Sequence, residues 1–417
     1  MATTTAAQAT GPKPYAYTGR DAQGKIVKGK LDGTSESAVL AKLRGMNITP
    51  ITVNESSSGS GLNMEINISF LEKQVGLKDL AIMARQMATM TASGLSLIRT
   101  LSILAEQTEN KVLGKTLQTV RNEVESGLSL SDSMARQSKI FPPLMVNLIR
   151  AGETGGFLEN TLESIAENYE KDVKLRSTIK SALTYPVTVL ILAFVAVIGM
   201  LIFVVPVFEQ MFANLGGDLP LPTQFLVLLS KNMLWMGPLL LVIIVGTSIW
   251  WRKNRFEPRV LRVIDPIKLK LPVFGDLLTK VSIARFTRNF GTMIGAGVPI
   301  LQSLAIVGET SGNYVIEQAL VKVAESVRSG KSISAPLAQE PVFPAMVTQM
   351  ISVGEDSGSL EVMLAKIADF YDQEVESTAE QLTALIEPLM IAVIGIVIGG
   401  MIVALYLPIF SIFDQIQ

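Results

Sequence analysis

VTVLILAFVAVIGMLIFVV, residues 187–205, is an unbroken apolar run inside the longer stretch 181–208, which carries no formal charge. Two further uncharged stretches follow, at 232–251 and at 388–413. A helix needs about 20 apolar residues to cross the hydrocarbon core of a bilayer, so each stretch can span it. We therefore predict three transmembrane helices, bounded at 181–208, 232–251 and 384–410.

The charges beside these stretches indicate the orientation of the chain. Basic residues flank the cytoplasmic ends of membrane spans. The segment 206–231 contains a single basic residue, and the tail 411–417 contains none. We expect the N-terminus and both large polar regions in the cytoplasm, with the loop 209–231 and the C-terminal tail outside. The flanking basic residues are Lys171, Lys174, Arg176 and Lys180 before the first span, and Arg252, Lys253, Arg255, Arg259 and Arg262 after the second.

The composition also argues for a membrane protein and against an enzyme. Of the 417 residues, 48% are hydrophobic and 18% charged, which is more apolar than a soluble protein. The net charge of -1 gives no sign of nucleic-acid binding. The chain contains no cysteine and no histidine, so thiolate metal sites and the commonest general base are excluded. The loop 19–26, GRDAQGKI, lacks the hydroxyl residue that a phosphate-binding loop places after its lysine. No catalytic residue, metal or cofactor is predicted.

The central feature of the organisation is an internal repeat. A constant offset that places Arg85 on Arg288 superimposes one half of the chain on the other, and the match continues to the end of the repeat after a one-residue deletion. The second uncharged stretch has no counterpart and returns the chain to the cytoplasm. The matched pairs include Arg85 and Arg288, Gly152 and Gly354, Glu153 and Glu355, Pro186 and Pro388, and Pro206 and Pro408.

Apolar residues at helical spacing, such as Leu158, Leu162, Ile165 and Tyr169, predict that each repeat is a bundle of about six helices whose last helix continues into a span. Strands and one helix are predicted within residues 15–53. The fold class is thus mainly α, an integral membrane protein with three transmembrane helices, two homologous cytoplasmic helical bundles and a small N-terminal α+β unit. The predicted boundaries are 1–14 flexible tail, 15–53 α+β unit, 54–76 linker and possible amphipathic helix, 77–180 first bundle, 181–208 first span, 209–231 external loop, 232–251 second span, 252–383 cytoplasmic segment with the second bundle, 384–410 third span and 411–417 external tail.

Glu153 and Glu355 stand out because each lies in a Gly-Glu-x-x-Gly motif that begins at Gly152 or Gly354. In one interpretation the glycines break a helix and the glutamate satisfies free amides at the start of the next helix. In the other, the glutamates contact a partner or bind a cation weakly. Arg85 and Arg288 begin the two repeats, where either a surface ion pair or a contact to a cytoplasmic partner is expected.

Four prolines and one glycine motif mark the spans. Pro186 and Pro388 lie where a cytoplasmic helix becomes a span, and Pro206 and Pro408 lie near the other end. Proline kinks a helix or begins a new one, so Pro186 and Pro388 could transmit motion or form a static bend. Gly395 and Gly399 form a small-residue face that suits close helix packing, either in a dimer or against spans of the same chain.

These motifs together resemble the PilC/GspF family, the inner-membrane platform proteins of type IV pili and type II secretion systems. The resemblance rests on the duplicated Arg-x-x-x-Thr-Met-x-x-x-Gly, Ser-Gly-x-Ser, Phe-Pro and Gly-Glu-x-x-Gly-x-Leu motifs, each set followed by a tyrosine and the proline at the start of a span. It covers nearly the whole chain from Tyr15. It implies a non-enzymatic scaffold of the bacterial inner membrane. This scaffold would be the platform of a type IV pilus assembly machine that couples a cytoplasmic hexameric ATPase to pilin extraction and fibre assembly, with a type II secretion or competence pseudopilus platform as the alternative.

The implied partners are a cytoplasmic assembly or retraction ATPase, pilins or pseudopilins, other inner-membrane components of the machine, the lipid bilayer and a second copy of the chain, with a dimer favoured. A small membrane transporter subunit is a rival from another class. A transporter needs a polar path through the bilayer, and the three uncharged stretches offer none.

Overall fold

The computed structural model describes residues 13–20, 26–55, 74–215, 219–255, 257–272 and 274–415. The chain divides into two compact units, residues 1–71 and 72–417. The predicted tail 1–14 and linker 54–76 lie largely outside the described residues.

The smaller unit contains a three-stranded antiparallel sheet and one helix. Strands β1 (Lys13–Arg20), β2 (Ile26–Gly33) and β3 (Thr49–Glu55) pair in the order β2-β1-β3. Helix α1 (Glu36–Gly45) begins at Ser35, whose hydroxyl accepts a hydrogen bond from the Ala38 amide. Tyr15, Val39, Leu43 and Ile48 form its buried core.

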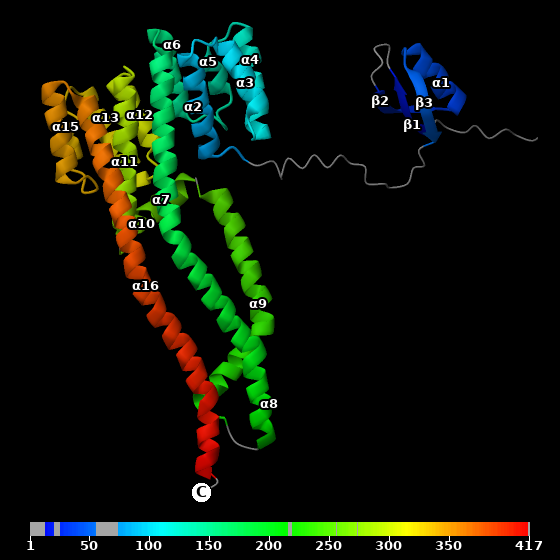
Figure 1. The fold of residues 1–417 in the computed structure, drawn as a ribbon. Helices are drawn as coiled ribbons and strands as arrows, with labels where there is room; N and C mark the ends of the chain where they lie inside the picture. Colours follow the sequence, from blue (N-terminus) through cyan, green and yellow to red (C-terminus); the bar gives the residue numbers. More distant parts are fainter. Residues whose placement is uncertain are drawn as a thin grey trace, which may run out of the picture. The chain divides into compact units, whose positions relative to one another are not determined.

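The first bundle of the larger unit contains six helices, the last of which is 42 residues long (Figure 1). Asn110 caps α4, because its side-chain oxygen accepts hydrogen bonds from the amides of Val112 and Leu113 at 3.1 and 3.3 Å. Gly156 has a φ of 74° and ends α6 in the left-handed region that favours glycine. The helices are α2 (Leu77–Ala92), α3 (Leu97–Gln107), α4 (Lys111–Glu125), α5 (Leu130–Arg136), α6 (Pro143–Gly155) and α7 (Leu158–Gly199).

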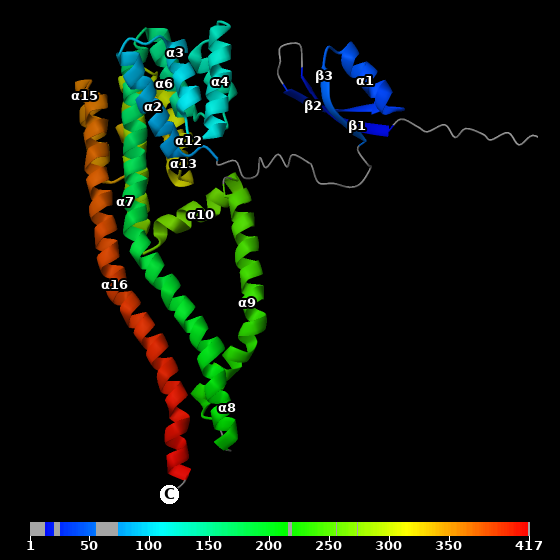
Figure 2. The same cartoon turned by 45° about the vertical axis from the view of Figure 1, so that its right-hand side comes forward.

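The second bundle repeats this arrangement. Asn313 caps α13 as Asn110 caps α4, and Gly358 ends α15 with a φ of 67°. The last helix, α16, is 56 residues long and continues beyond the bundle as α7 does (Figure 2). Helix α10 (Pro258–Lys270) leads into this bundle, which comprises α11 (Phe274–Gly295), α12 (Ile300–Thr310), α13 (Tyr314–Arg328), α14 (Ser334–Leu337), α15 (Ala345–Ser357) and α16 (Leu360–Gln415).

Two helical segments are long and apolar enough to cross a membrane, Leu158–Ala213 and Leu360–Phe410. The first comprises α7, a π-helical turn η1 (Met200–Val204) and α8 (Val205–Leu215). A third candidate, α9 (Leu221–Asn254), qualifies only if its two halves count as one span, because they are bent by 61° near residue 234. Pro238 explains the bend, since a proline ring collides with the carbonyl group four residues earlier.

Residues 209–231 differ from the prediction of an external loop. Helix α8 continues to Leu215 and α9 begins at Leu221, so most of this segment is helical. The carboxylate of Glu209 forms an ion pair with the Lys231 ammonium group at 2.6 Å, which joins the two helices.

Candidate functional site: the joints between bundles and spans

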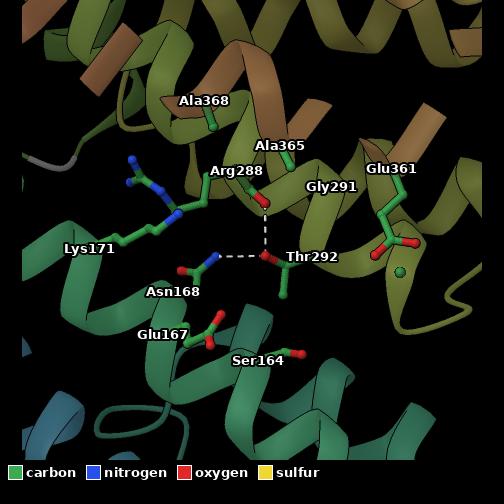
Figure 3. A pocket seen from close by; sticks show the side chains of 11 residues that line it. Ser164, Glu167, Asn168, Lys171, Arg288, Gly291, Thr292, Glu361, Ala365 and Ala368 are labelled. Carbon is green, nitrogen blue, oxygen red and sulfur yellow. Dashed lines mark hydrogen bonds between the residues drawn. The ribbon is translucent and has the colours of Figure 1, made fainter. Parts of the chain in front are cut away.

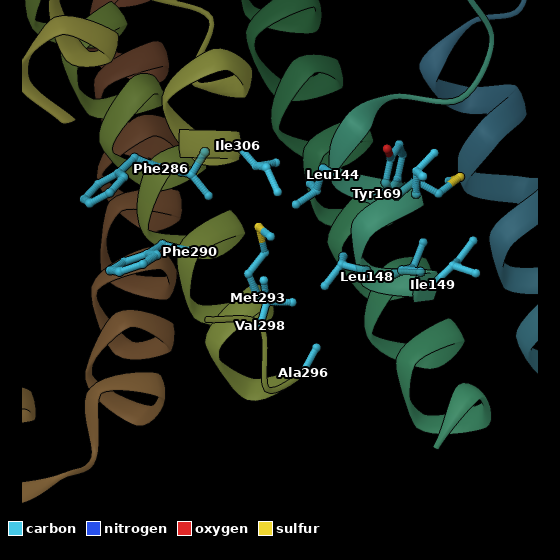
Figure 4. Close-up of a cluster of buried hydrophobic side chains, with 14 of the residues drawn as sticks. Leu144, Leu148, Ile149, Tyr169, Phe286, Phe290, Met293, Ala296, Val298 and Ile306 are labelled. Carbon is cyan, nitrogen blue, oxygen red and sulfur yellow. The ribbon is translucent and has the colours of Figure 1, made fainter. Parts of the chain in front are cut away.

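The two bundles share one hydrophobic core. Buried side chains of both bundles belong to a single continuous cluster. Figure 4 shows Leu144 and Leu148 of α6 facing Met293 and Ile306, which belong to α11 and α12. Removing this apolar surface from water favours the joined state. The bundles are therefore packed against each other as one body.

Polar bonds at this junction join helix α7 to the second bundle. The buried Asn168 amide donates to Asn289 Oδ1 and to Thr292 Oγ1, both at 3.1 Å. Arg285 of α11 forms an ion pair with Asp172 at 3.0 Å. Because hydrogen bonds depend on distance and direction, these contacts fix the register of the packing, which apolar burial alone would leave less specified.

A second apolar cluster continues the junction toward the membrane. Leu175 of α7, Val281 of α11 and Leu382 of α16 belong to it, together with Leu277, Val375 and Ala379. The three helices thus stay in contact up to the point where α7 and α16 become apolar on all sides.

The prolines at the spans lie inside continuous helices. Pro186 is within α7, and Pro388 and Pro408 are within α16, so none of them begins a new helix. Figure 1 shows α7 changing direction between its bundle part and its apolar part. A proline has no N–H, so the carbonyl that would accept from it is left without a partner. In lipid such a carbonyl must find another donor.

Hydroxyl groups of neighbouring helices bond to three of these freed carbonyls. Pro408 frees the carbonyl of Ala404, which accepts a hydrogen bond from the buried Thr223 hydroxyl of α9. Pro186 frees the carbonyl of Ala182, which accepts from the Thr383 hydroxyl of α16 at 3.2 Å. That hydroxyl also lies 3.0 Å from the carbonyl oxygen of Ala379 in its own helix. It therefore divides its single hydrogen between an acceptor in α7 and an acceptor in α16.

The third link involves the π-helical turn before Pro206. In this turn each amide donates to the carbonyl five residues earlier, as Val205 does to Met200. Pro206 therefore frees the carbonyl of Leu201, and the buried Ser230 hydroxyl of α9 donates to it at 2.6 Å. Each of these three prolines is thus paired with a hydroxyl-bearing residue on another helix. For Pro388 the corresponding Ala384 is exposed, and no such link is recorded among the described residues.

Glu153 and Glu355 lie elsewhere, inside the bundles, and their role differs from the one expected. Glu153 lies within α6, and its carboxylate accepts hydrogen bonds from the amides of Leu130 and Ser131 at 2.6 and 3.0 Å. Glu355 accepts from Ile333 and Ser334 at 2.5 and 2.9 Å. Each glutamate therefore caps a helix that precedes it in the chain, α5 or α14. The expectation that it serves the following helix is wrong.

Gly152 and Gly354 also do not break their helices. Both lie inside α6 or α15, and the breaks come at Gly156 and Gly358. A Cβ at Gly152 would lie 2.5 Å from Thr161 Oγ1, so glycine is required for the close approach of α6 to α7. At Gly354 a Cβ would lie 3.0 Å from Leu360 Cα.

Arg85 and Arg288 connect the first and last helix of their own bundles. Arg85 is 34% exposed and donates to both oxygens of Glu170 at 2.7 Å and to Glu163. These hydrogen bonds, first to Glu170 and then to Glu163, raise the pKa of Arg85 above its ordinary value, and Arg85 lowers the pKa of Glu170. Arg288 pairs with Asp372 but is only 6% exposed, so the expected surface ion pair is wrong for this residue.

Gly395 and Gly399 have open surroundings. A Cβ built at either position would meet no atom within 4 Å, so these glycines do not mediate close packing against the described part of the same chain. The dimer alternative stays a prediction.

Comparison with known proteins identifies the family. The model of the type II secretion system (T2SS) protein F matches residues 83–206 and again residues 286–408, more than half of the chain. The chain belongs to the type II secretion system protein F family. The family's N-terminal domain matches residues 12–54. Because one and the same family model matches both halves of the chain, the internal repeat is confirmed.

Members of the protein F family resemble this chain along almost their full length. The type IV pilus assembly protein PilC of Thermus thermophilus is 40% identical over 404 residues, covering 97% of this chain and 99% of that protein. PilC of Pseudomonas aeruginosa is 36% identical over 379 residues, 90% and 98% of the two chains. The type II secretion system protein F of Vibrio cholerae is 31% identical over 395 residues, 95% and 97%. Proteins of this family are non-enzymatic platform proteins, as the lack of histidine and cysteine predicts.

The proline–hydroxyl links of this protein F family member predict a specific mutational coupling. Thr223→Val should lower the free energy of unfolding by about 1 kcal/mol, because it removes the donor and leaves the Ala404 carbonyl unpaired. In a Pro408→Ala background the same substitution should cost less than half as much, since the alanine amide can bond to that carbonyl.

A double-mutant cycle of unfolding in mixed micelles measures this coupling. The matched control is Thr247→Val on the same helix, whose exposed hydroxyl bonds only to carbonyls of α9. Equal costs of Thr223→Val with and without Pro408 would contradict the link.

Proposed function

We propose that this chain is the inner-membrane platform of a type IV pilus assembly machine, and that it couples a cytoplasmic hexameric ATPase to pilin extraction and fibre assembly. The names of relatives that match 90% or more of the chain support this role, since the PilC proteins of Thermus thermophilus, Myxococcus xanthus and Pseudomonas aeruginosa are 36–40% identical to it. The alternative, a platform for type II secretion, is supported by relatives named protein F at about 30% identity.

The observation that carries the proposal is the continuity of α7 and α16. Each begins in a bundle with buried residues such as Leu162 or Leu364 and runs without a break into an apolar segment. A helix is a stiff rod over this length, so a movement of the bundle displaces the membrane segment. The shared core makes the two bundles move together. A motor that turns or rocks them would therefore move both spans at once.

The chain is a protein of the inner membrane, and we assign it three spans. Helix α9, which is bent near residue 234, forms the second span and returns the chain to the cytoplasm. The basic residues before α7 and after α9 support cytoplasmic bundles and N-terminus, and an external C-terminus. This orientation gives an internal ATPase access to the bundles.

The other proposed partners act within the bilayer. Pilins or pseudopilins and further inner-membrane components would contact the spans, whose apolar side chains, such as Leu192 and Ile396, are exposed in the isolated chain. The open face at Gly395 and Gly399 supports a homodimer, because small residues allow two helices to approach closely.

Cysteine labelling tests the orientation. The chain has no native cysteine, so single cysteines report unambiguously. In spheroplasts a membrane-impermeant maleimide should label Leu221→Cys, at the external end of α9, and should not label Asn122→Cys or Ser329→Cys in the bundles. All three should react after lysis. Labelling of Asn122→Cys in sealed spheroplasts would place the bundles outside and exclude coupling to an internal motor.

Glycine insertion tests the mechanical role. Two glycines inserted between Lys180 and Ser181 should abolish fibres while the protein is retained in the membrane, because each interior glycine costs about 1 kcal/mol of helix stability and softens α7 above its span. The same insertion in the Ser/Gly segment 56–61 should leave piliation normal. Fibre counts by electron microscopy and immunoblots of membranes measure both. Normal fibres with the insertion in α7 would contradict force transmission through this helix.

A further inference from the structure

Helix α10 exposes apolar and basic side chains on the same side. Val263 and Ile267 are four residues apart, so they share one side of the helix, and they are 61% and 56% exposed. Arg259, Arg262 and Lys270 are exposed on this side too, and within the described part of the chain none of the three is joined to an acidic residue. Basic residues beside exposed apolar ones are typical of a helix that lies along a membrane surface.

The opposite side of α10 is bonded to the second bundle. The side chain of Asp265 is 2% exposed, and its Oδ2 atom accepts a hydrogen bond from the Tyr314 amide at the start of α13 at 3.0 Å. Its Oδ1 atom pairs with the Lys268 ammonium group at 2.9 Å. A buried carboxylate that is bonded at both oxygens holds the helix at one rotation about its axis. Val263 and Ile267 therefore stay on the outer side.

The positive charge of the outer side is not balanced by nearby acidic groups. The only acidic residue within α10, Asp265, is paired with Lys268. Burial, then the charge of Glu309 and then that of Asp265 raise the pKa of Glu317 in α13, so Glu317 lies toward the inner side of α10. Glu257 is exposed before the first residue of the helix, and even with it the basic groups are in excess. The outer side therefore attracts anions.

Both ends of α10 lie close to the level where the chain enters its apolar segments. Pro258 follows the last residue of α9 by four residues, which span at most about 14 Å. Trp250 and Trp251 at this end of α9 are exposed, as tryptophans of an interfacial belt are. At the other end α11 follows, and its Leu277 belongs to the apolar cluster beside the point where α7 and α16 become apolar on all sides. Figure 2 shows α10 lying across the direction of α9.

We propose that α10 is an interfacial helix whose outer side binds anionic phospholipid headgroups. The three basic side chains contact lipid phosphates, and Val263 and Ile267 enter the boundary between headgroups and acyl chains. A guanidinium group donates two hydrogen bonds to one phosphate, and the same contact removes the apolar side chains from water. Because Asp265 joins α10 to α13, the bound helix holds the second bundle at the bilayer. The inference rests on the proposed assignment of α9 as a span, but on neither the motor nor the fibre.

Fluorescence quenching in lipid nanodiscs tests the position of α10. The full chain has no native cysteine, so an NBD fluorophore on Ile267→Cys reports a single site. Phosphatidylcholine and phosphatidylglycerol that carry a nitroxide near the headgroup, at equal mole fractions, should both quench it. The anionic lipid should quench at least about two-fold more strongly. The matched control, Val321→Cys on α13, is 48% exposed and should be quenched by neither lipid.

Charge removal tests the headgroup contact. Arg259→Gln/Lys270→Gln should reduce the preference for phosphatidylglycerol to less than half and leave quenching by both lipids, because the apolar side chains still contact the bilayer. The control Arg328→Gln/Lys331→Gln removes the same charge from exposed residues at the far end of α13, roughly 20 Å from Tyr314, and should keep the preference. If the first variant does not fold, Arg262→Gln alone should lower the preference.

Three results would overturn the proposal. Absence of quenching at Ile267, while a label on Ile243→Cys within α9 is quenched, excludes lipid contact whether water or a second copy covers α10. Equal quenching by the two lipids excludes an anionic site, and so does an equal loss of preference in the Arg328 control. Absence of quenching at Ile243 as well contradicts the assignment of α9 as a span, so a failure of the proposed topology is distinguished from a failure of this inference alone.

Discussion

One interaction underlies much of the structure: at three of the four span prolines, a hydroxyl group of a neighbouring helix bonds to the backbone carbonyl that the proline frees. Pro186, Pro206 and Pro408 each free a carbonyl, and hydroxyl groups of Thr383, Ser230 and Thr223 bond to them from neighbouring helices. The prolines thus bend or locally widen their helices and at the same time create acceptors that hold the helices together. The same proline therefore bends its helix and frees the carbonyl that accepts a hydrogen bond from the neighbouring helix. Such joints allow α7 and α16 to change direction without losing continuity.

Contacts between helices also join the two bundles to each other. The shared core and the bonds of Asn168 and Arg285 make a single body out of two repeats. A duplicated module usually tolerates independent motion of its copies when their interface is small and polar. Here the apolar cluster passes through the interface without interruption. Two long helices leave this body for the membrane, so a rotation of the body would be transmitted at two points.

Much of this architecture is predictable from the sequence, because it follows from long-range patterns within one chain. The constant offset between the two halves predicts the repeat that the family match bears out, and two of the three apolar runs lie in helices long and apolar enough to cross a membrane. These sequence patterns do not indicate which side chains contact each other in the folded chain. Glu153 caps α5, which lies earlier in the chain, because α5 and α6 fold back on each other. The hydroxyl partners of the prolines lie on other helices, far away along the chain, and threonine and serine are too common in membrane helices to be singled out. The unequal surroundings of Arg85 and Arg288 were detectable, since the repeat aligns Glu163 with Ala365, but their significance depends on the burial of Arg288.

The central claim is that both bundles move as one body. Spin labels on cysteines at Asn122 in α4 and Val321 in α13, two positions in different bundles, measure this directly by pulsed dipolar spectroscopy of the full chain in lipid nanodiscs. The account predicts a single narrow distance distribution, because the shared core and the junction bonds fix the bundles together. A broad distribution, or two separate distances, would contradict it.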